Sequence, residues 1–203
     1  MRKLVQALTE AASHPELCMG VDLGHPERRT TGIAIMCVRC LRTWIFTTFP
    51  VHVLSTCTYL RDRLRIVAID APLSLPRRGI ERPLEKICRQ AGYRLIPPLL
   101  GGMRRLTETG ICIKEIVEKL NINVIEIHPR SSLKSMKLTK VDELLKILSV
   151  RPGNRHEVDA VLACVTALAY LKHMFIEIRD EEGNSLILPR PEIVNLLCQK
   201  RDR

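Results

Sequence analysis

The segment Cys18-Met-Gly-Val-Asp-Leu23 places one aspartate near the end of a short, otherwise apolar run. Such a run predicts a β-strand that is buried on both faces, because a strand with one face in solvent would alternate polar and apolar residues. The turn-like Gly24-His-Pro-Glu-Arg-Arg follows, and strand patterns recur at 31–38 and 43–49. The short connections predict that these three strands form an antiparallel meander.

Two further apolar strands and several helical patterns follow the meander. The strands are expected at 65–70 and 123–128, and both are apolar enough to be buried on two faces. This order predicts a mixed α/β fold with a ligand crevice at the carboxyl ends of the central strands. The remaining expected elements are helices at 53–63, 82–90, 102–120, 140–149 and 157–172, a hairpin of 175–179 with 185–188, and a short C-terminal helix.

The composition is that of a globular domain with a strongly basic balance. Of the 203 residues, 46% are apolar and 27% are charged, which excludes a disordered chain. Aromatic residues make up 3%, too few for a single-strand binder that stacks bases on exposed rings. The net charge of +10 favours a polyanionic partner, most often nucleic acid.

The sequence predicts a soluble, cytoplasmic protein. Residues 1–10 read as a short amphipathic helix without the apolar run of a signal peptide, and the apolar stretch 161–171 is too short to cross a bilayer. Most of the eight cysteines lie in apolar segments and are expected to be small buried residues. Cys37-Val-Arg-Cys40 has metal or redox spacing, but no second cysteine pair accompanies it, so a zinc site is not expected there.

Acidic residues follow the apolar strands at the points where those strands end. Asp22, Asp70 and Glu126 are each delivered to the rim of the predicted sheet, and Asp159 lies near the start of an apolar helix, three residues after His156. A buried carboxylate must be paired, protonated or bound to a metal. An oxygen-rich cluster of this kind suits two Mg²⁺ or Mn²⁺ ions, which can activate water for phosphodiester cleavage.

Each acid taken alone also fits an ordinary structural role. Asp159 could stabilise a helix N-terminus, Glu126 could form a salt bridge, and Asp70 could cap a turn. The recurrence of acids at strand ends favours the metal site over these separate roles.

Basic residues follow the same strand ends and are expected to contact the phosphate backbone of a nucleic acid. Segment 131–155 carries six basic and two acidic residues, whereas 156–180 carries two and four, so the positive charge is concentrated in particular loops. The expected phosphate contacts are Arg28, Arg29, Arg77, Arg78, Arg104, Arg105, Arg130 and Lys134.

Several of these segments together resemble a largely archaeal and bacterial family of domains of unknown function, described as predicted nucleases of ribonuclease-H-like fold. The segments are Gly20-Val-Asp-Leu-Gly, Thr31-Thr-Gly-Ile-Ala, Ala68-Ile-Asp-Ala-Pro-Leu-Ser, Pro97-Pro-Leu-Leu-Gly-Gly-Met-Arg, Glu126-Ile-His-Pro and His156-Glu-Val-Asp-Ala. The resemblance covers 18–190 and implies a sheet of three antiparallel and two parallel strands flanked by helices. The sequence pattern adds a helical extension at 1–17 and a C-terminal helix at 191–203. It also implies that Asp22, Asp70 and Asp159 hold the metals, with His156 beside them, and that Glu126 belongs to the family's own motif.

The expected function is a metal-dependent nuclease in which Asp22, Asp70 and Asp159 bind two ions and Glu126 is a further ligand or a base. His156 and His128 are expected to assist proton transfer, and resolvase-like action would require a homodimer. A non-catalytic nucleic-acid-binding protein of the same fold is the first alternative. A phosphotransferase related to the actin-like kinases is the second, because Asp22-Leu-Gly24 fits their first strand. No P-loop or Gly-x-Ser-x-Gly elbow is present in the sequence.

Overall fold

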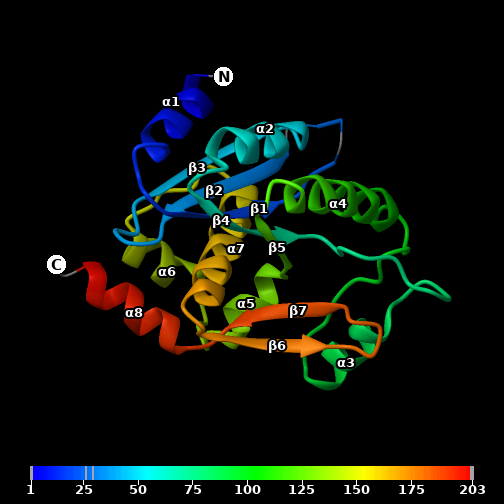
Figure 1. Cartoon of the computed structure of the whole chain (residues 1–203). Coiled ribbons are helices and arrows are strands. Elements are labelled where there is room, and N and C mark those ends of the chain that lie inside the picture. Colours follow the sequence, from blue (N-terminus) through cyan, green and yellow to red (C-terminus); the bar gives the residue numbers. More distant parts are fainter. Residues whose placement is uncertain (1, 26, 29, 202–203) are drawn as a thin grey trace.

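A five-stranded mixed sheet forms the centre of the computed structural model, which describes all residues except 1, 26, 29 and 202–203 (Figure 1). The strand order is β3-β2-β1-β4-β5. β1 pairs antiparallel with β2, and β2 with β3, whereas β1 pairs parallel with β4, and β4 with β5. The predicted sheet of three antiparallel and two parallel strands is therefore confirmed. The strands are β1 (Leu17–Asp22), β2 (Thr31–Cys37), β3 (Thr43–Thr48), β4 (Leu64–Asp70) and β5 (Asn123–Glu126).

Helices cover both faces of the sheet, and each face has its own apolar core. On one face, α1 (Arg2–Ala11), α2 (Val51–Leu60) and α4 (Met103–Glu118) pack through residues such as Val53 and Val117. On the other face lie α5 (Pro129–Ser135), α6 (Val141–Leu148), α7 (Arg155–Leu171) and α8 (Glu192–Arg201). This two-sided cover explains why β1 and β2 lack the alternating pattern of a half-exposed strand.

Two glycines allow α7 to lie directly against the sheet. A Cβ atom at Gly20 in β1 would collide with the backbone of Ala160 and Cys164, and one at Gly32 in β2 would collide with the backbone of His156. Any side chain at these positions would push α7 outward. The glycines therefore fix the start of α7, with His156 and Asp159, beside the end of β1.

The hairpin and α3 lie beyond β5, at the lower right of Figure 1. β6 (Phe175–Arg179) pairs antiparallel with β7 (Ser185–Pro189), as expected, and Gly183 has a φ of 86° in the connecting turn. The helix α3 (Pro83–Gln90) is tied to this hairpin because the Leu84 N–H donates to the Asp180 carboxylate at 3.1 Å. Within the described part of the chain, no helix has the length and hydropathy to cross a membrane.

One helix was not expected from the sequence. The segment after Glu126 was interpreted as a basic loop, but Pro129–Ser135 forms α5. The helix has only seven residues and contains three serines, which are weak helix formers, so the local pattern is faint. Proline at the first helical position and the burial of Ser131, Ser132 and Ser135 against the rest of the fold account for the helix. The expected strand at 123–128 is correspondingly shorter and ends at Glu126.

Candidate active site

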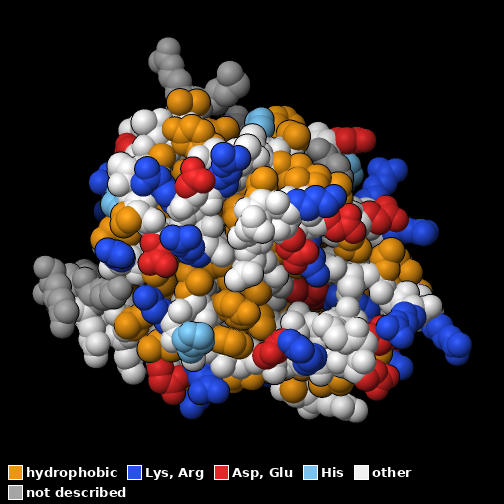
Figure 2. All heavy atoms as spheres, viewed as in Figure 1, with side chains coloured by type: hydrophobic (Ala, Val, Ile, Leu, Met, Phe, Trp, Pro, Cys, Tyr) orange, Lys and Arg blue, Asp and Glu red, His pale blue; other side chains and the backbone are white. Residues whose placement is uncertain are grey.

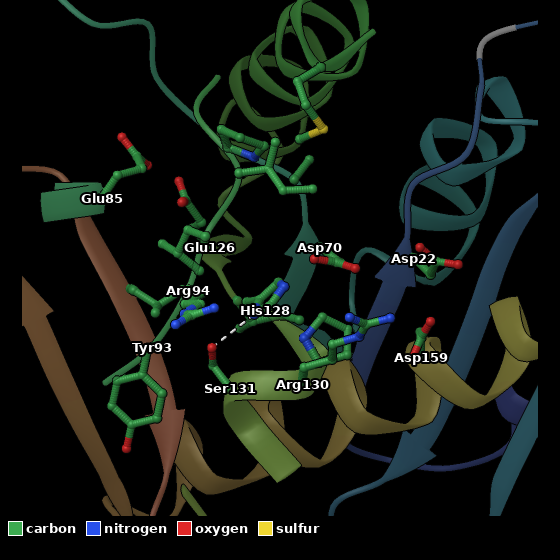
Figure 3. Close-up of a pocket in the computed structure, with 18 of the residues that line it drawn as sticks. Asp22, Asp70, Glu85, Tyr93, Arg94, Glu126, His128, Arg130, Ser131 and Asp159 are labelled. Atoms are coloured by element: carbon green, nitrogen blue, oxygen red, sulfur yellow. Dashed lines mark hydrogen bonds between the residues drawn. The ribbon is translucent and has the colours of Figure 1, made fainter. Parts of the chain in front are cut away.

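A cavity of about 880 Å³ opens at the carboxyl ends of β1, β4 and β5 (Figure 3). Asp22, Asp70 and Asp159 line one side of it, and Glu126 and His128 line another part. The cavity therefore occupies the crevice that the strand order predicts. Three of the predicted acids face the same space although they lie far apart in the sequence.

The sheet register places Asp22 and Asp70 next to each other. They are Cα partners in the last position of the parallel pair β1 and β4, and both are partly buried. Asp159 approaches from the side because α7 lies against β1. Figure 3 shows the three carboxylates around one region of the cavity, with the Arg130 side chain reaching from the start of α5 toward them.

His156 is a partner of Asp22. Its Nδ1 atom lies 2.6 Å from Asp22 Oδ2, and with a proton on Nδ1 the imidazole donates to the carboxylate. Burial raises the pKa of Asp22 above its ordinary value, while the His156 hydrogen bond and the charges of His156 and Arg155 act in the opposite direction. His156, predicted from its spacing to Asp159, thus orients the aspartate at the end of β1.

Asp70 is the least compensated acid of the cavity. Burial raises its pKa well above the ordinary value, and the negative charges of Asp22, Asp159 and Glu126 raise it further. Among the described residues, no hydrogen bond or ion pair to the Asp70 carboxylate is found. Burial also raises the pKa of Asp159, where the charges of Arg155, His156 and Arg130 oppose the effect. A cluster of this kind is electrostatically costly unless a cation or protons neutralise it.

Glu126 has a different set of partners from the three aspartates. Its Oε1 and Oε2 atoms accept hydrogen bonds from the buried Arg82 guanidinium at 2.6 and 2.8 Å, and Oε2 also accepts from the Leu73 N–H at 2.8 Å. Arg82 also binds Glu85 and donates to Ser74 Oγ. Glu126 is thus held by a buried cation rather than turned toward the aspartates, and its expected role as a metal ligand or base stays a prediction.

Arg82 is a buried residue whose importance the sequence reasoning missed. Its side chain is fully buried, and the carboxylates of Glu126 and Glu85 raise its pKa above the ordinary value against the effect of burial. The spacing of Arg82 and Glu85, three residues apart at the start of α3, was a local signal for an ion pair. The link to Glu126, 44 residues away, was not readable because only the folded chain brings them together.

His128 lies at the start of α5, with Nδ1 2.8 Å from Ser131 Oγ. Burial and the nearby Arg130 lower the pKa of His128, which favours the neutral imidazole near pH 7. Because His128 also lines the cavity, it offers a neutral group that can exchange a proton.

The predicted phosphate contacts divide into two groups. Arg130 and Lys134 line the cavity, together with Arg94 and Arg155, which the sequence reasoning did not select. Arg105 lines a separate depression between α2 and α4, Arg104 pairs with Glu108, and Arg77 lies 3.7 Å from Glu182. Arg28 and Arg78 are exposed and do not line the cavity, and Arg29 lies outside the described residues. Figure 2 shows Lys and Arg side chains over much of this face, interspersed with acidic ones.

A second cluster of metal-ligating side chains lies at the other end of the sheet. Among the described residues, one group of three has its ligand atoms all within 4.8 Å of one another, and it consists of His14, Cys37 and Cys40 rather than the aspartates. The sequence reasoning set Cys37 and Cys40 aside because no second cysteine pair was found. The signal it missed was His14, which lies just before the strand whose first residue, Leu17, pairs with Cys37.

Comparison with known proteins finds a distant structural similarity. One similar solved structure is that of RuvC from Thermus thermophilus, with a TM-score of 0.46 and 14% sequence identity, over 77% of this chain and 96% of the RuvC chain. No family model and no curated protein matches the sequence. The fold assignment rests on the strand order and directions described above, and membership in the predicted-nuclease family stays a prediction.

Proposed function

We propose that this protein is a metal-dependent phosphodiesterase that cleaves nucleic acid, with Asp22, Asp70 and Asp159 as the ligands of Mg²⁺ or Mn²⁺. The observation that carries the proposal is the convergence of these three carboxylates, from the ends of β1 and β4 and the start of α7, on one cavity. Acids at separate strand ends do not meet by sequence proximity, so a shared chemical task is the simplest reason for their arrangement.

The donor set fits a hard divalent cation. All three side chains offer carboxylate oxygens, the ligand type that Mg²⁺ and Mn²⁺ prefer. None of the three offers a thiol or an imidazole, the ligand types that zinc would favour. Asp70 in particular has a charge that no described cationic partner compensates. When bound, two such ions would activate a water molecule and stabilise the leaving oxygen of a phosphodiester.

The remaining residues of the cavity would bind and orient the substrate. Arg130, Arg155, Arg94 and Lys134 line the same cavity as the acids, and their positive charge would hold phosphates of the substrate. His156 keeps the Asp22 carboxylate in one orientation through the 2.6 Å contact. Neutral His128 would exchange a proton with water or with the leaving oxygen.

Cleavage of a substrate series tests the proposal. Duplex DNA, RNA–DNA hybrid, single strands and a four-way junction are incubated with Mg²⁺ or Mn²⁺ and with wild type or the Asp70→Asn variant. We expect wild type to cleave at least one substrate and Asp70→Asn to be slower by at least about 1,000-fold, because metal catalysis contributes several kcal/mol to the transition state. The matched control is Asp62→Asn, which removes an exposed carboxylate outside the cavity and should leave the rate unchanged.

Two outcomes would contradict the proposal. Full cleavage by Asp70→Asn would show that the aspartate cluster is not the catalytic centre. Chelator-insensitive binding by wild type without cleavage of any of the substrates would favour the non-catalytic nucleic-acid-binding protein. The expected cytoplasmic location and homodimer stay predictions. Light scattering with and without a four-way junction tests the dimer.

A further inference from the structure

The side chains of His14, Cys37 and Cys40 form a compact group at the end of the sheet opposite the aspartates. His14 lies between α1 and β1, Cys37 is the last residue of β2, and Cys40 lies in the turn that leads to β3. Their ligand atoms all lie within 4.8 Å of one another. In the β1–β2 register, Leu17 pairs with Cys37, whereas Asp22 pairs with Gly32. The group is therefore separate from the carboxylate cavity.

The distances fit a tetrahedral site. A zinc ion with Zn–S of about 2.3 Å and Zn–N of about 2.0–2.1 Å places sulfur and nitrogen about 3.5 Å apart when the bond angle is tetrahedral. The distance between Cys40 Sγ and His14 Nδ1 is 3.5 Å. A thiol and an imidazole can also meet at this distance in a weak hydrogen bond, so the pair alone does not define a site. The third atom, Cys37 Sγ, lies within the same small volume and supplies the missing ligand.

The backbone around Cys37 holds the two sulfurs in place. The Cys37 carbonyl accepts from the Leu41 N–H at 2.9 Å, which closes a tight turn, and the Cys40 N–H lies 3.4 Å from Cys37 Sγ as a donor. This contact fixes the position of Cys37 Sγ relative to the turn that carries Cys40. Leu41 has a φ of 61°, a conformation that is unfavourable for leucine and is imposed by this turn.

His14 is held from the other side by contacts that orient its ring. The imidazole packs edge-on against the indole of Trp44, with ring centroids 5.0 Å apart. Trp44 is itself fixed because its Nε1–H donates to the Glu10 carboxylate at 3.0 Å, and Arg42 donates to the same Glu10 oxygen at 2.8 Å. Outer contacts of this kind fix the ligands of metal sites in advance of binding.

We propose that His14, Cys37 and Cys40 form a second metal site, specific for a thiophilic divalent cation such as Zn²⁺, with a fourth position that faces solvent at the exposed Cys40. Two thiolates and one imidazole are the ligand set that Zn²⁺ prefers and Mg²⁺ does not. The site joins the α1–β1 connection to the β2–β3 turn, and β1 and β2 lie between these two segments in the sequence. Bound metal would therefore stabilise the N-terminal side of the sheet.

Cobalt titration of the full-length protein tests the proposal. The protein is first reduced with a phosphine and freed of metal, and Co²⁺ is then added while the near-ultraviolet thiolate-to-cobalt absorption is followed. We expect one equivalent of Co²⁺ to give this absorption and Zn²⁺ to abolish it by displacement. Cobalt at the aspartates gives no thiolate band, so Asp70→Asn should leave the signal unchanged whether or not the proposed nuclease activity is real.

Substitutions at the ligands sharpen the test. Cys40→Ser, at an exposed position that should not affect folding, is expected to weaken Co²⁺ binding beyond the roughly 10- to 100-fold loss that outer contacts alone produce. His14→Gln leaves both thiols in place and should shift the band and weaken binding to a similar extent. The matched control is Cys198→Ser, because Cys198 is also exposed but belongs to no such described group. Absence of the band in reduced wild type, or an unchanged band in either ligand variant, would overturn the proposal.

Discussion

The two ends of β1 carry opposite kinds of chemistry. At its carboxyl end, three aspartates from different elements share a cavity, and Asp70 has no described cationic partner. At its amino end, roughly 16 Å away by the rise of a strand, two sulfurs from a tight turn and the imidazole of His14 lie close together. Oxygen ligands in an open cavity suit a hard ion that must also contact substrate, whereas sulfur ligands in a rigid turn suit an ion that holds structure.

The difference shows how one strand can serve two purposes. The carboxylate end is electrostatically unfavourable without a counter-charge, so its stability should depend on metal and on pH. The thiol end is held by backbone hydrogen bonds and by Trp44, so its geometry should persist without metal. The predictions below test whether the two ends behave independently and whether each acid of the cavity has the role that its contacts indicate.

The largest expected effect on stability is that of Glu126→Gln. The substitution removes one of the two carboxylates that compensate buried Arg82, while Glu85 stays paired with it. Both Glu126 oxygens accept hydrogen bonds, so the amide NH₂ of glutamine must face a donor, and breaking a buried ion pair costs about 3–5 kcal/mol. We expect the free energy of unfolding, measured in urea, to fall by this amount equally with and without Mn²⁺, because Glu126 anchors Arg82 rather than a metal. The matched control is Glu108→Gln, which removes an exposed partner of Arg104 and should cost well under 1 kcal/mol. A loss confined to the Mn²⁺-loaded protein would instead make Glu126 a ligand.

The second prediction concerns the glycine that lies between the two ends. Gly20→Ala places a Cβ atom against the backbone of Ala160 and Cys164, so α7 must move or the strand must distort, at a cost of about 2–3 kcal/mol. Because α7 carries Asp159, we expect Mn²⁺-dependent stabilisation to be lost while the Co²⁺–thiolate signal is kept. Thermal unfolding with and without Mn²⁺ measures the first quantity, and the near-ultraviolet absorption with Co²⁺ measures the second. Gly102→Ala is the control, since nothing lies near its Cβ position, and equal loss of both signals would mean that the ends are coupled.

The third prediction is that the loss of a buried carboxylate makes the metal-free protein more stable, whereas most substitutions of buried residues destabilise a protein. Burial and the neighbouring acids raise the pKa of Asp70, so the folded protein binds a proton more tightly there than the unfolded chain does. The metal-free protein should therefore lose stability as the pH rises from about 4, the unfolded value, through the raised pKa, and remain at the lower level above it. Asp70→Asn removes this loss, and we expect it to be more stable than wild type by about 1 kcal/mol at neutral pH.

Chemical denaturation at several pH values in the presence of a chelator checks this third prediction. The difference between variant and wild type should shrink as the pH falls through the raised pKa toward 4, and below 4 the wild-type carboxyl is protonated in both states. Asp62→Asn, at an exposed site, should show no such trend. A lower stability of Asp70→Asn at neutral pH would contradict the prediction, because another group of the protein would then have to stabilise the Asp70 charge in the absence of metal.

The sequence was sufficient for the sheet and for the aspartates, and the reason is local. β1 and β4 are largely apolar runs, and Asp22 and Asp70 are their last residues, so parallel pairing alone brings the two acids together. The short helix α5 could not be predicted, because its serines are poor helix formers and tertiary burial decides its conformation. The Arg82–Glu126 pair and the His14 contribution to the thiol group depend on contacts between distant segments, which no local pattern reports.

The smallest expected effect is on the affinity for nucleic acid, and it distinguishes an arginine of the cavity from one outside it. Arg130 lines the cavity and Arg78 does not, although both were selected from the sequence as phosphate contacts. With cleavage blocked by Asp70→Asn, we expect the added Arg130→Gln change to weaken binding of a cleavable substrate by about threefold. This is less than a tenfold change in affinity, which corresponds to about 1.4 kcal/mol. The slope of log affinity against log salt should decrease by about one, as for the loss of one phosphate contact. Arg78→Gln in the same background should change neither quantity. Equal effects of the two substitutions would mean that the substrate also contacts the surface outside the cavity. The contrast between the two ends of the strand would then no longer explain where nucleic acid binds.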